Sequence, residues 1–192
     1  MKKLILLPFI ALIIYSGKSY AQIQRGNFLV GGNLANLNLN LGNDNYFQVN
    51  LTPKAAFFIR DNVALGGYVD FGLATAKGQG TSSSYGVGAL GRYYISDPEV
   101  NLLRQGRFFL EANAGVEGVS FSGGSNTTGL GLGAGPGYAY FITPNIGLEA
   151  LLKYRGIVGF GSEAYQSNLG LSFGFQIYLP GRRAQAIIED AN

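Results

Sequence analysis

Eight charged residues within the long alternating segments of this sequence are the first candidates for chemistry. Four are acidic and four are basic, so the set is electrically balanced. Carboxylates held away from water can serve as general acids and bases, whereas balanced opposite charges in one interior can form ion pairs that fill it. The eight candidates are Lys54, Asp70, Arg92, Glu111, Glu117, Glu149, Lys153 and Arg155.

The composition removes most catalytic alternatives. The 192 residues include no histidine and no cysteine, so the commonest general base and the thiolate nucleophile are both missing. Histidine-dependent hydrolase and protease mechanisms therefore lack their base. We expect no enzyme activity, no metal site and no cofactor, and we interpret the eight charges as a structural or pore-lining ion-pair network.

Two glycine motifs resemble nucleotide-binding loops. Residues 86–91 read GVGALG, with Glu111 a further 20 residues on, and residues 129–134 read GLGLGA. A dinucleotide site needs a strand before the glycines and a helix that opens from them. The segments that follow, RYYISDP and YAYFITP, look like strands that end near a proline. The sequence therefore argues against nucleotide binding.

The second motif belongs to a run in which every other residue is glycine. If the run is a strand, one of its faces carries no side chains. We predict that this bare face is a small-residue wall of the interior, which leaves room for charged groups from neighbouring strands. Its members are Gly129, Gly131, Gly133, Gly135 and Gly137.

The elements that must position these residues are long β-strands. Period-2 alternation of apolar and polar residues recurs eight times, and all eight charges lie on the phase opposite the apolar one. A run of 11 residues at ~3.3 Å per residue and ~40° tilt rises roughly 27 Å, which crosses an apolar band of ~25 Å. The alternating segments are 27–41, 47–57, 63–73, 85–95, 108–117, 130–140, 146–155 and 169–177. The phase of the first segment is less clear, because FLVGG and LNLNL both contribute apolar residues.

The connections and aromatic residues favour an up-and-down transmembrane barrel. Tight turns at 60–62 and 143–145 alternate with glycine-rich loops at 76–84, 120–128 and 159–167, as in outer-membrane barrels. Two connections fit this alternation less well: 42–45 is short for a loop, and 96–106 is long for a turn, with a helical turn predicted at 99–104. Aromatic residues gather near both ends of the strands, which predicts two girdles at the membrane interfaces. A soluble β-sandwich shares the alternation, but it predicts shorter strands and charge usage near ~25%, against 13% here.

The first 21 residues have the layout of a secretory signal peptide. Two lysines precede a 12-residue apolar run, and small residues stand before Gln22. A membrane-spanning helix needs a longer apolar run, roughly 17–25 residues. Removal of this segment takes three lysines with it. The remaining chain has 11 basic and 11 acidic residues, so its net charge is zero. The high isoelectric point is therefore no sign of nucleic-acid binding.

Four stretches carry a resemblance to a known family. FLVGGNLANLNL, VGALGRYYI, ITPNIGLEALLKY and LSFGFQIYL resemble the small porin-like outer-membrane β-barrel family, the OmpA/OmpX-type eight-stranded barrels of Gram-negative bacteria. The resemblance covers essentially the whole chain after residue 21. It implies an outer-membrane location, insertion by the barrel-assembly machinery with periplasmic chaperones, and no catalytic set.

Together these observations predict an all-β, eight-stranded antiparallel barrel at 22–179, with a short periplasmic tail at 180–192. We expect a monomer in contact with outer-membrane lipid, exported by its signal peptide, without a nucleic-acid partner. The expected role is non-enzymatic, structural or at the surface, with a lumen closed by the inward charges. A narrow channel for small solutes is the alternative, and an adhesin that binds through its loops is a third.

Overall fold

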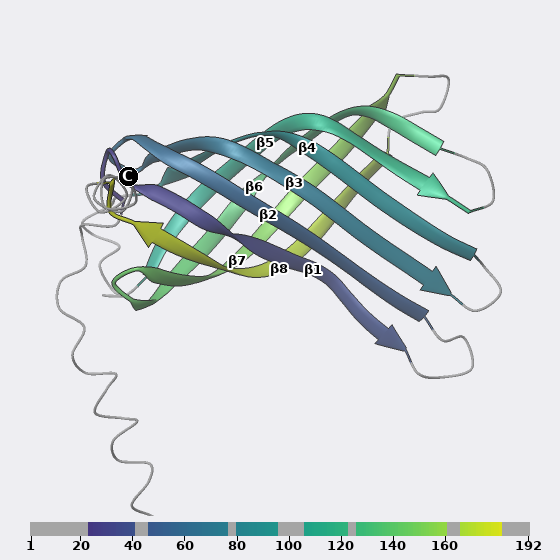
Figure 1. Ribbon diagram of the computed structural model, residues 1–192, viewed down its shortest axis with the longest axis horizontal. Helices are drawn as coiled ribbons and strands as arrows, with labels where there is room; N and C mark the ends of the chain where they lie inside the picture. Colours follow the sequence, from purple (N-terminus) through teal and green to yellow (C-terminus); the bar gives the residue numbers. More distant parts are fainter. Residues whose placement is uncertain are drawn as a thin grey trace, which may run out of the picture.

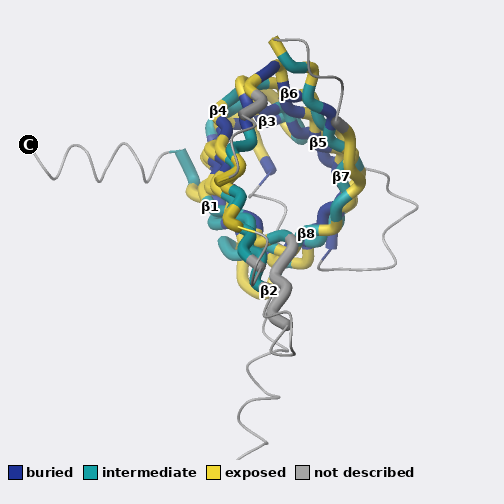
Figure 2. The backbone as a smooth tube through the Cα atoms, turned by 90° about the vertical axis from the view of Figure 1, so that its right-hand side faces the viewer, coloured by how far each residue is buried: buried dark blue, intermediate teal, exposed yellow. Residues whose placement is uncertain are grey.

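The computed structural model of the chain describes residues 23–40, 46–76, 80–95, 106–122, 126–160 and 166–181. In this part of the chain, eight antiparallel strands form one closed barrel in which β1 also pairs with β8 (Figures 1 and 2). The predicted up-and-down barrel is confirmed, and a two-sheet sandwich is excluded. The strands are β1 (Phe28–Asn40), β2 (Tyr46–Arg60), β3 (Val63–Ala76), β4 (Gly80–Tyr94), β5 (Gly106–Phe121), β6 (Asn126–Thr143), β7 (Ile146–Gly159) and β8 (Gln166–Leu179).

The start of β1 and the end of β8 lie at the same end of the barrel, which we call the termini end (Figure 1). Two tight turns that the sequence predicted lie at this end. Asn62 turns the chain between β2 and β3 with φ of 66°, a conformation that asparagine tolerates well. Thr143 Oγ1 accepts backbone hydrogen bonds from Asn145 and Ile146 in the turn between β6 and β7.

The opposite end, which we call the loop end, has longer strands than the sequence predicted. The predicted loop at 76–84 is wrong for its second half, because β4 begins at Gly80 and its serines pair with β3 and β5. Strands also extend into the predicted loops at 120–128 and 159–167. Their polar, glycine-rich composition was misleading, because strands that project beyond an apolar band no longer need apolar residues.

A β-bulge explains why the phase of the first strand was unclear from the sequence. The register between β1 and β2 shifts between Ala35 and Asn38. A bulge adds a residue to one strand and so interrupts the alternation of faces. Before it, Leu29 and Asn33 are buried inside, whereas Phe28 and Val30 are exposed.

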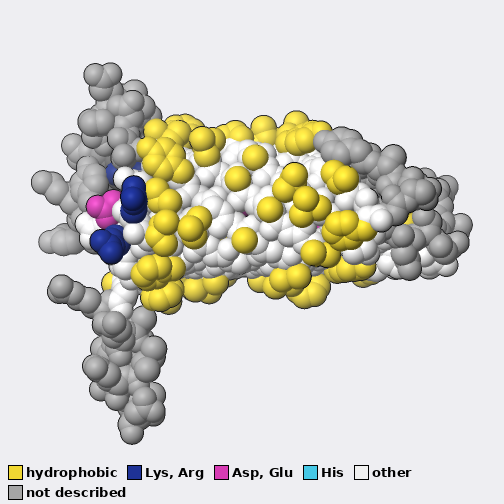
Figure 3. Space-filling model, turned by 90° about the horizontal axis from the view of Figure 1, so that it is seen from above, with side chains coloured by type: hydrophobic (Ala, Val, Ile, Leu, Met, Phe, Trp, Pro, Cys, Tyr) yellow, Lys and Arg dark blue, Asp and Glu magenta, His cyan; other side chains and the backbone are white. Residues whose placement is uncertain are grey.

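The outer wall of the barrel is apolar along its length. In Figure 3 hydrophobic side chains are spread along the whole length of the wall, and the visible charges gather at the termini end. Leu65, Val87 and Phe173 are 50–60% exposed on this surface. Within the described residues, no helix is long and apolar enough to cross a membrane. The predicted signal peptide (1–21), a helical turn predicted at 99–104 and the tail beyond Gly181 lie outside the described residues.

Candidate functional site in the barrel lumen

Four aromatic rings fill the lumen at the termini end. Phe58, Tyr94, Phe109 and Tyr178 come from four strands, and each is less than 2% exposed. Their ring centroids lie 5.6–6.4 Å apart, within the range in which aromatic pairs attract each other. We call these four residues the aromatic plug. Water reaches none of them.

The aromatic plug corrects one prediction. The sequence analysis assigned all aromatic residues near the strand ends to girdles on the outside. Residues next to each other in a strand point to opposite faces, so a pair of aromatics supplies one ring to each side. Tyr93 and Phe108 are exposed on the wall, whereas their neighbours Tyr94 and Phe109 are inside.

Arg92 lies in the lumen one inward-facing position beyond Tyr94 on β4. Its Nη1 is 2.6 Å from Glu149 Oε1 on β7, and its Nη2 is 2.6 Å from Glu111 Oε2 on β5. The guanidinium carbon also lies 4.1 Å from the centre of the Phe109 ring. The Arg92 side chain has no exposed surface. It therefore links opposite walls of the barrel in a dry environment.

Two lysines complete what we call the central network. Lys54 Nζ lies 2.8 Å from Glu111 Oε2, and Lys153 Nζ lies 3.5 Å from Glu111 Oε1. Glu111 thus faces three cations. Taking each charge out of water costs several kcal/mol, so such an arrangement holds only while every member keeps its partners. The members of the central network are Lys54, Arg92, Glu111, Glu149 and Lys153.

Hydrogen bonds join the central network to the aromatic plug. Arg92 Nη1 donates to the Tyr94 hydroxyl at 2.9 Å. The Tyr178 hydroxyl donates to Glu149 Oε1 at 3.0 Å and lies 2.7 Å from the Tyr94 hydroxyl. The rings and the charges therefore form one connected unit across the lumen.

A second group of charges, the upper cluster, lies closer to the loop end. Arg155 Nη1 is 3.0 Å from Asp70 Oδ2, and Arg155 Nε is 3.7 Å from Glu117 Oε2. The Thr52 hydroxyl donates to Asp70 at 2.6 Å, and the Tyr68 hydroxyl donates to Glu117 at 2.7 Å. With this cluster, the structure places all eight charges of the sequence analysis inside the lumen and brings each within ion-pair distance of an opposite charge.

The glycine run predicted as a bare wall lies along β6 with its glycines toward the lumen, while Leu132 and Ala134 are exposed outside. A Cβ atom at Gly131 would overlap the Glu117 side chain, and one at Gly137 would overlap the Phe109 ring. The other glycines of the run, Gly129, Gly133 and Gly135, lie in the same way against β5 side chains or the β7 backbone. The bare wall therefore accommodates large inward side chains of β5.

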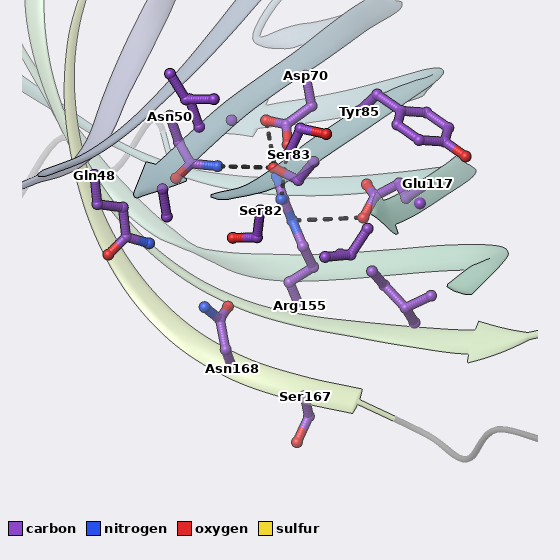
Figure 4. A pocket seen from close by; sticks show the side chains of 17 residues that line it. Gln48, Asn50, Asp70, Ser82, Ser83, Tyr85, Glu117, Arg155, Ser167 and Asn168 are labelled. Atoms are coloured by element: carbon purple, nitrogen blue, oxygen red, sulfur yellow. Dashed lines mark hydrogen bonds and ion pairs between the residues drawn. The ribbon is translucent and has the colours of Figure 1, made fainter. Parts of the chain in front are cut away.

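A cavity of about 260 Å³ lies beyond the upper cluster, at the loop end of the lumen (Figure 4). Asp70, Glu117 and Arg155 form its floor, and the Arg155 side chain is 22% exposed. Hydroxyl and amide groups line its wall. They belong to Gln48, Asn50, Ser82, Ser84, Ser167 and Asn168.

In the part of the chain that the structure describes, the other candidate motifs and carboxylates lie in continuous strands and ion pairs. Residues 86–91, the G-x-G-x-x-G motif, lie in the middle of β4, which continues on both sides, so no helix opens from them. Each of the four lumen carboxylates has a cation within 3.7 Å. Within the described residues, no group of three or more acidic, histidine or cysteine side chains is placed to hold a metal ion.

Comparisons with solved structures show the fold. No protein-family model and no curated protein sequence matches the chain. It is similar to Neisserial surface protein A (NspA), with 22% sequence identity and a TM-score of 0.54 over 79% of this chain and 96% of that one. The N-terminal β-barrel domain of Pseudomonas aeruginosa OprF matches with 14% identity and a TM-score of 0.51, over 81% of this chain and 98% of that domain.

The chain has the fold of the eight-stranded outer-membrane barrels. The outer membrane enzyme PagL also matches, with 14% identity over 79% of this chain and 99% of that one. Its TM-score of 0.41 is too low to bear on catalysis.

The sequence analysis of this outer-membrane-type barrel missed the neutral partners of the charges. Tyr68 stands on the polar phase of β3, yet it is buried and bonded to Glu117. Asn113 donates to the Tyr68 hydroxyl at 3.0 Å. The sequence does contain one indication of this arrangement. A bulky tyrosine that faces the lumen needs space, and Gly88 and Gly115 provide it, because a Cβ atom at either position would overlap the Tyr68 side chain.

Replacing Tyr68 with phenylalanine tests these neutral partners. Tyr68→Phe removes the donor to Glu117 and the acceptor for Asn113, both of which stay buried. Leaving such groups unsatisfied costs ~1–3 kcal/mol, so the free energy of unfolding should fall by about that amount. Urea unfolding followed by circular dichroism measures it. Tyr93→Phe, on the exposed face of β4, is the control and should change it by less than ~0.5 kcal/mol; equal effects would contradict the role of Tyr68.

Proposed function

We propose that this chain is a non-enzymatic integral outer-membrane barrel with a structural role in the cell envelope and a closed lumen. One observation carries the proposal: the aromatic plug and the central network fill the lumen with side chains that are at most 2% exposed, except for Lys153 at 13%. A narrow channel for small solutes would need a wetted path past these groups.

The apolar wall supports a location in the membrane. A single lysine or arginine that faces lipid at mid-depth costs ~2–4 kcal/mol, and the eight charges within the strands lie in the lumen instead. Two proteins of similar fold are the Neisserial surface protein NspA and the N-terminal β-barrel domain of OprF, and the structural neighbours include outer-membrane proteins. We therefore propose the outer membrane as its location, after export by residues 1–21, with lipid and the barrel-assembly machinery as its partners.

The absence of an enzymatic role is supported by the chemistry of the lumen. The chain has no histidine and no cysteine. The four lumen carboxylates are already paired with cations, which holds them as structural charges rather than as free acids or bases. These paired charges favour a structural role in the envelope over an enzymatic one.

Conductance measurements test the closed lumen. The purified, refolded barrel in planar lipid bilayers should show no ion-sized current steps, because the plug leaves no wetted path. A variant with Tyr94→Ala and Phe109→Ala, which removes two plug rings, should raise the frequency of steps if it folds. Regular steps in the unmodified protein that change in Glu149→Gln would overturn the closed lumen in favour of the channel.

Cell fractionation separately tests the location. The protein should be recovered in the detergent-extracted outer-membrane fraction and should show a gel mobility that changes on heating, as folded barrels do. Recovery as a soluble periplasmic protein would refute the membrane proposal.

A further inference from the structure

The cavity at the loop end differs chemically from the rest of the lumen. Below it, charged groups pair with one another and are buried. In the cavity, the wall carries neutral hydroxyl and amide groups, with Asn50 on β2, Ser82 and Ser84 on β4, and Asn168 on β8. These groups both donate and accept hydrogen bonds. The wall therefore suits a neutral ligand that does the same.

The floor of the cavity favours neither an anion nor a cation. Asp70 and Glu117 flank Arg155, so the three charges sum to −1 and give an anion no net attraction. The guanidinium also stands between the two carboxylates (Figure 4), which screens them from a bound cation. A polar, uncharged ligand is not repelled by the net negative charge and does not need direct access to the carboxylates.

Arg155 still offers hydrogen bonds to such a ligand. A guanidinium carries five N–H donors, and Asp70 accepts two of these bonds, at 3.0 and 3.3 Å. The side chain is 22% exposed at the cavity floor. An oxygen atom of a ligand can therefore accept a hydrogen bond from the remaining N–H groups of the Arg155 guanidinium.

The shape and remaining surface of the cavity suit a sugar ring. Val119 and Ile157 also line it and provide an apolar patch for the C–H groups of the ring. Its volume of about 260 Å³ lies just below the ~300–1,000 Å³ of sites that enclose drug-sized molecules, which suits one ring rather than a whole disaccharide.

The polar wall is also held in place before a ligand arrives. Asn50 Nδ2 donates to Ser84 Oγ at 3.3 Å. A Cβ atom at Gly72 would overlap this pair, so the glycine provides the space in which the two side chains meet. Groups held in one position lose less entropy when they bind.

We infer that this cavity is a binding site for a neutral, hydroxyl-rich ring of hexose size, either a free saccharide or the sugar of a membrane-held glycolipid. This function goes beyond the proposed envelope role and holds whether or not the lumen conducts. The polar floor and wall recognise the hydroxyl groups, while Val119 and Ile157 contact the ring.

Nuclear magnetic resonance in dodecylphosphocholine micelles tests the inference, with glucose and galactose as probes. Each sugar is titrated into the folded protein, with the Asn50 and Asn168 side-chain amides as reporters. We expect saturable shifts of these signals with a Kd near ~1 mM, as single rings bind weakly. Octyl glucoside, whose single glucose ring is tethered to the micelle, is added in a second arm. Shifts with free sugar alone indicate a soluble saccharide, and shifts with the detergent indicate a glycolipid.

Matched variants show whether the signal comes from the cavity. Ser84→Leu fills it and should weaken binding at least about tenfold. Ala89→Leu adds a leucine on the exposed outer face of β4, away from the residues that line the cavity, and should bind like the unmodified protein. Asn168→Leu repeats the test from β8 if Ser84→Leu does not show heat-modifiable mobility. The inference would be overturned if neither sugar nor the detergent gave saturable shifts at concentrations up to about 0.1 M, which is far above the expected Kd of ~1 mM. It would also be overturned if the cavity-filling variants bound as tightly as the unmodified protein.

Discussion

Replacing Arg92 with methionine should destabilise the barrel more than any other removal of a single charge. Arg92→Met leaves Glu149 without its cation and Glu111 with the two lysines only. Breaking a buried ion pair by removal of one partner costs ~3–5 kcal/mol, a large part of a typical stability of ~5–15 kcal/mol. Urea unfolding in lipid vesicles, followed by circular dichroism and gel mobility because the chain has no tryptophan, measures the loss.

A double-mutant cycle separates the ion pair from the packing of Arg92 on Phe109. Arg92→Met combined with Glu149→Gln removes both ends of the 2.6 Å pair. Because the double variant leaves no unpaired charge at 149, it should lose less stability than the sum of the two single variants, by ~0.5–3 kcal/mol. Arg60→Met changes an exposed arginine at the end of β2 and serves as the control, with an effect below ~0.5 kcal/mol. Strictly additive effects would show that the pair contributes nothing.

The alternation of the sequence predicts the side of the wall on which each charge lies, because side-chain direction depends only on the local period of two. It does not predict the partners. Arg92 and Glu149 are 57 residues apart and meet across the lumen, which depends on the register and stagger of the closed barrel. The sequence therefore predicts that all eight charges face the lumen, but it does not predict that they divide into the central network and the upper cluster.

The aromatic plug could not be predicted from the alternation either, for a different reason. In each of the pairs 57–58, 93–94 and 108–109 both residues are aromatic, so the apolar phase is ambiguous within the pair. General β-propensity places aromatics on either face. Only the closed barrel shows that one member of each pair lies inside, where it shields the charges from water. Phe58 and Tyr94 pack on Tyr178, and Phe109 packs on Tyr94.

The glycine run of β6 gives the second large prediction. Gly133→Leu should prevent folding or lower the free energy of unfolding by more than ~3 kcal/mol, because overpacking alone costs ~1–3 kcal/mol and polar contacts are lost with it. A Cβ atom at this position would lie 2.5 Å from Asn113 Oδ1. Displacing Asn113 breaks its bond to the Tyr68 hydroxyl, which in turn donates to Glu117. The measurement is again urea unfolding, with heat-modifiable mobility as the test of folding.

The next residue provides a matched control for this prediction. Ala134→Leu makes an equally large side chain one position away, where Ala134 is exposed on the outer wall. An added leucine there meets lipid and should leave stability within ~0.5 kcal/mol. If Gly133→Leu folded with the stability of Ala134→Leu, the inner face of β6 would hold unused space, and the lumen would not be packed as tightly as a closed barrel requires. If Gly133→Leu fails while Ala134→Leu folds, the glycines are needed because the β5 side chains occupy the space beside them.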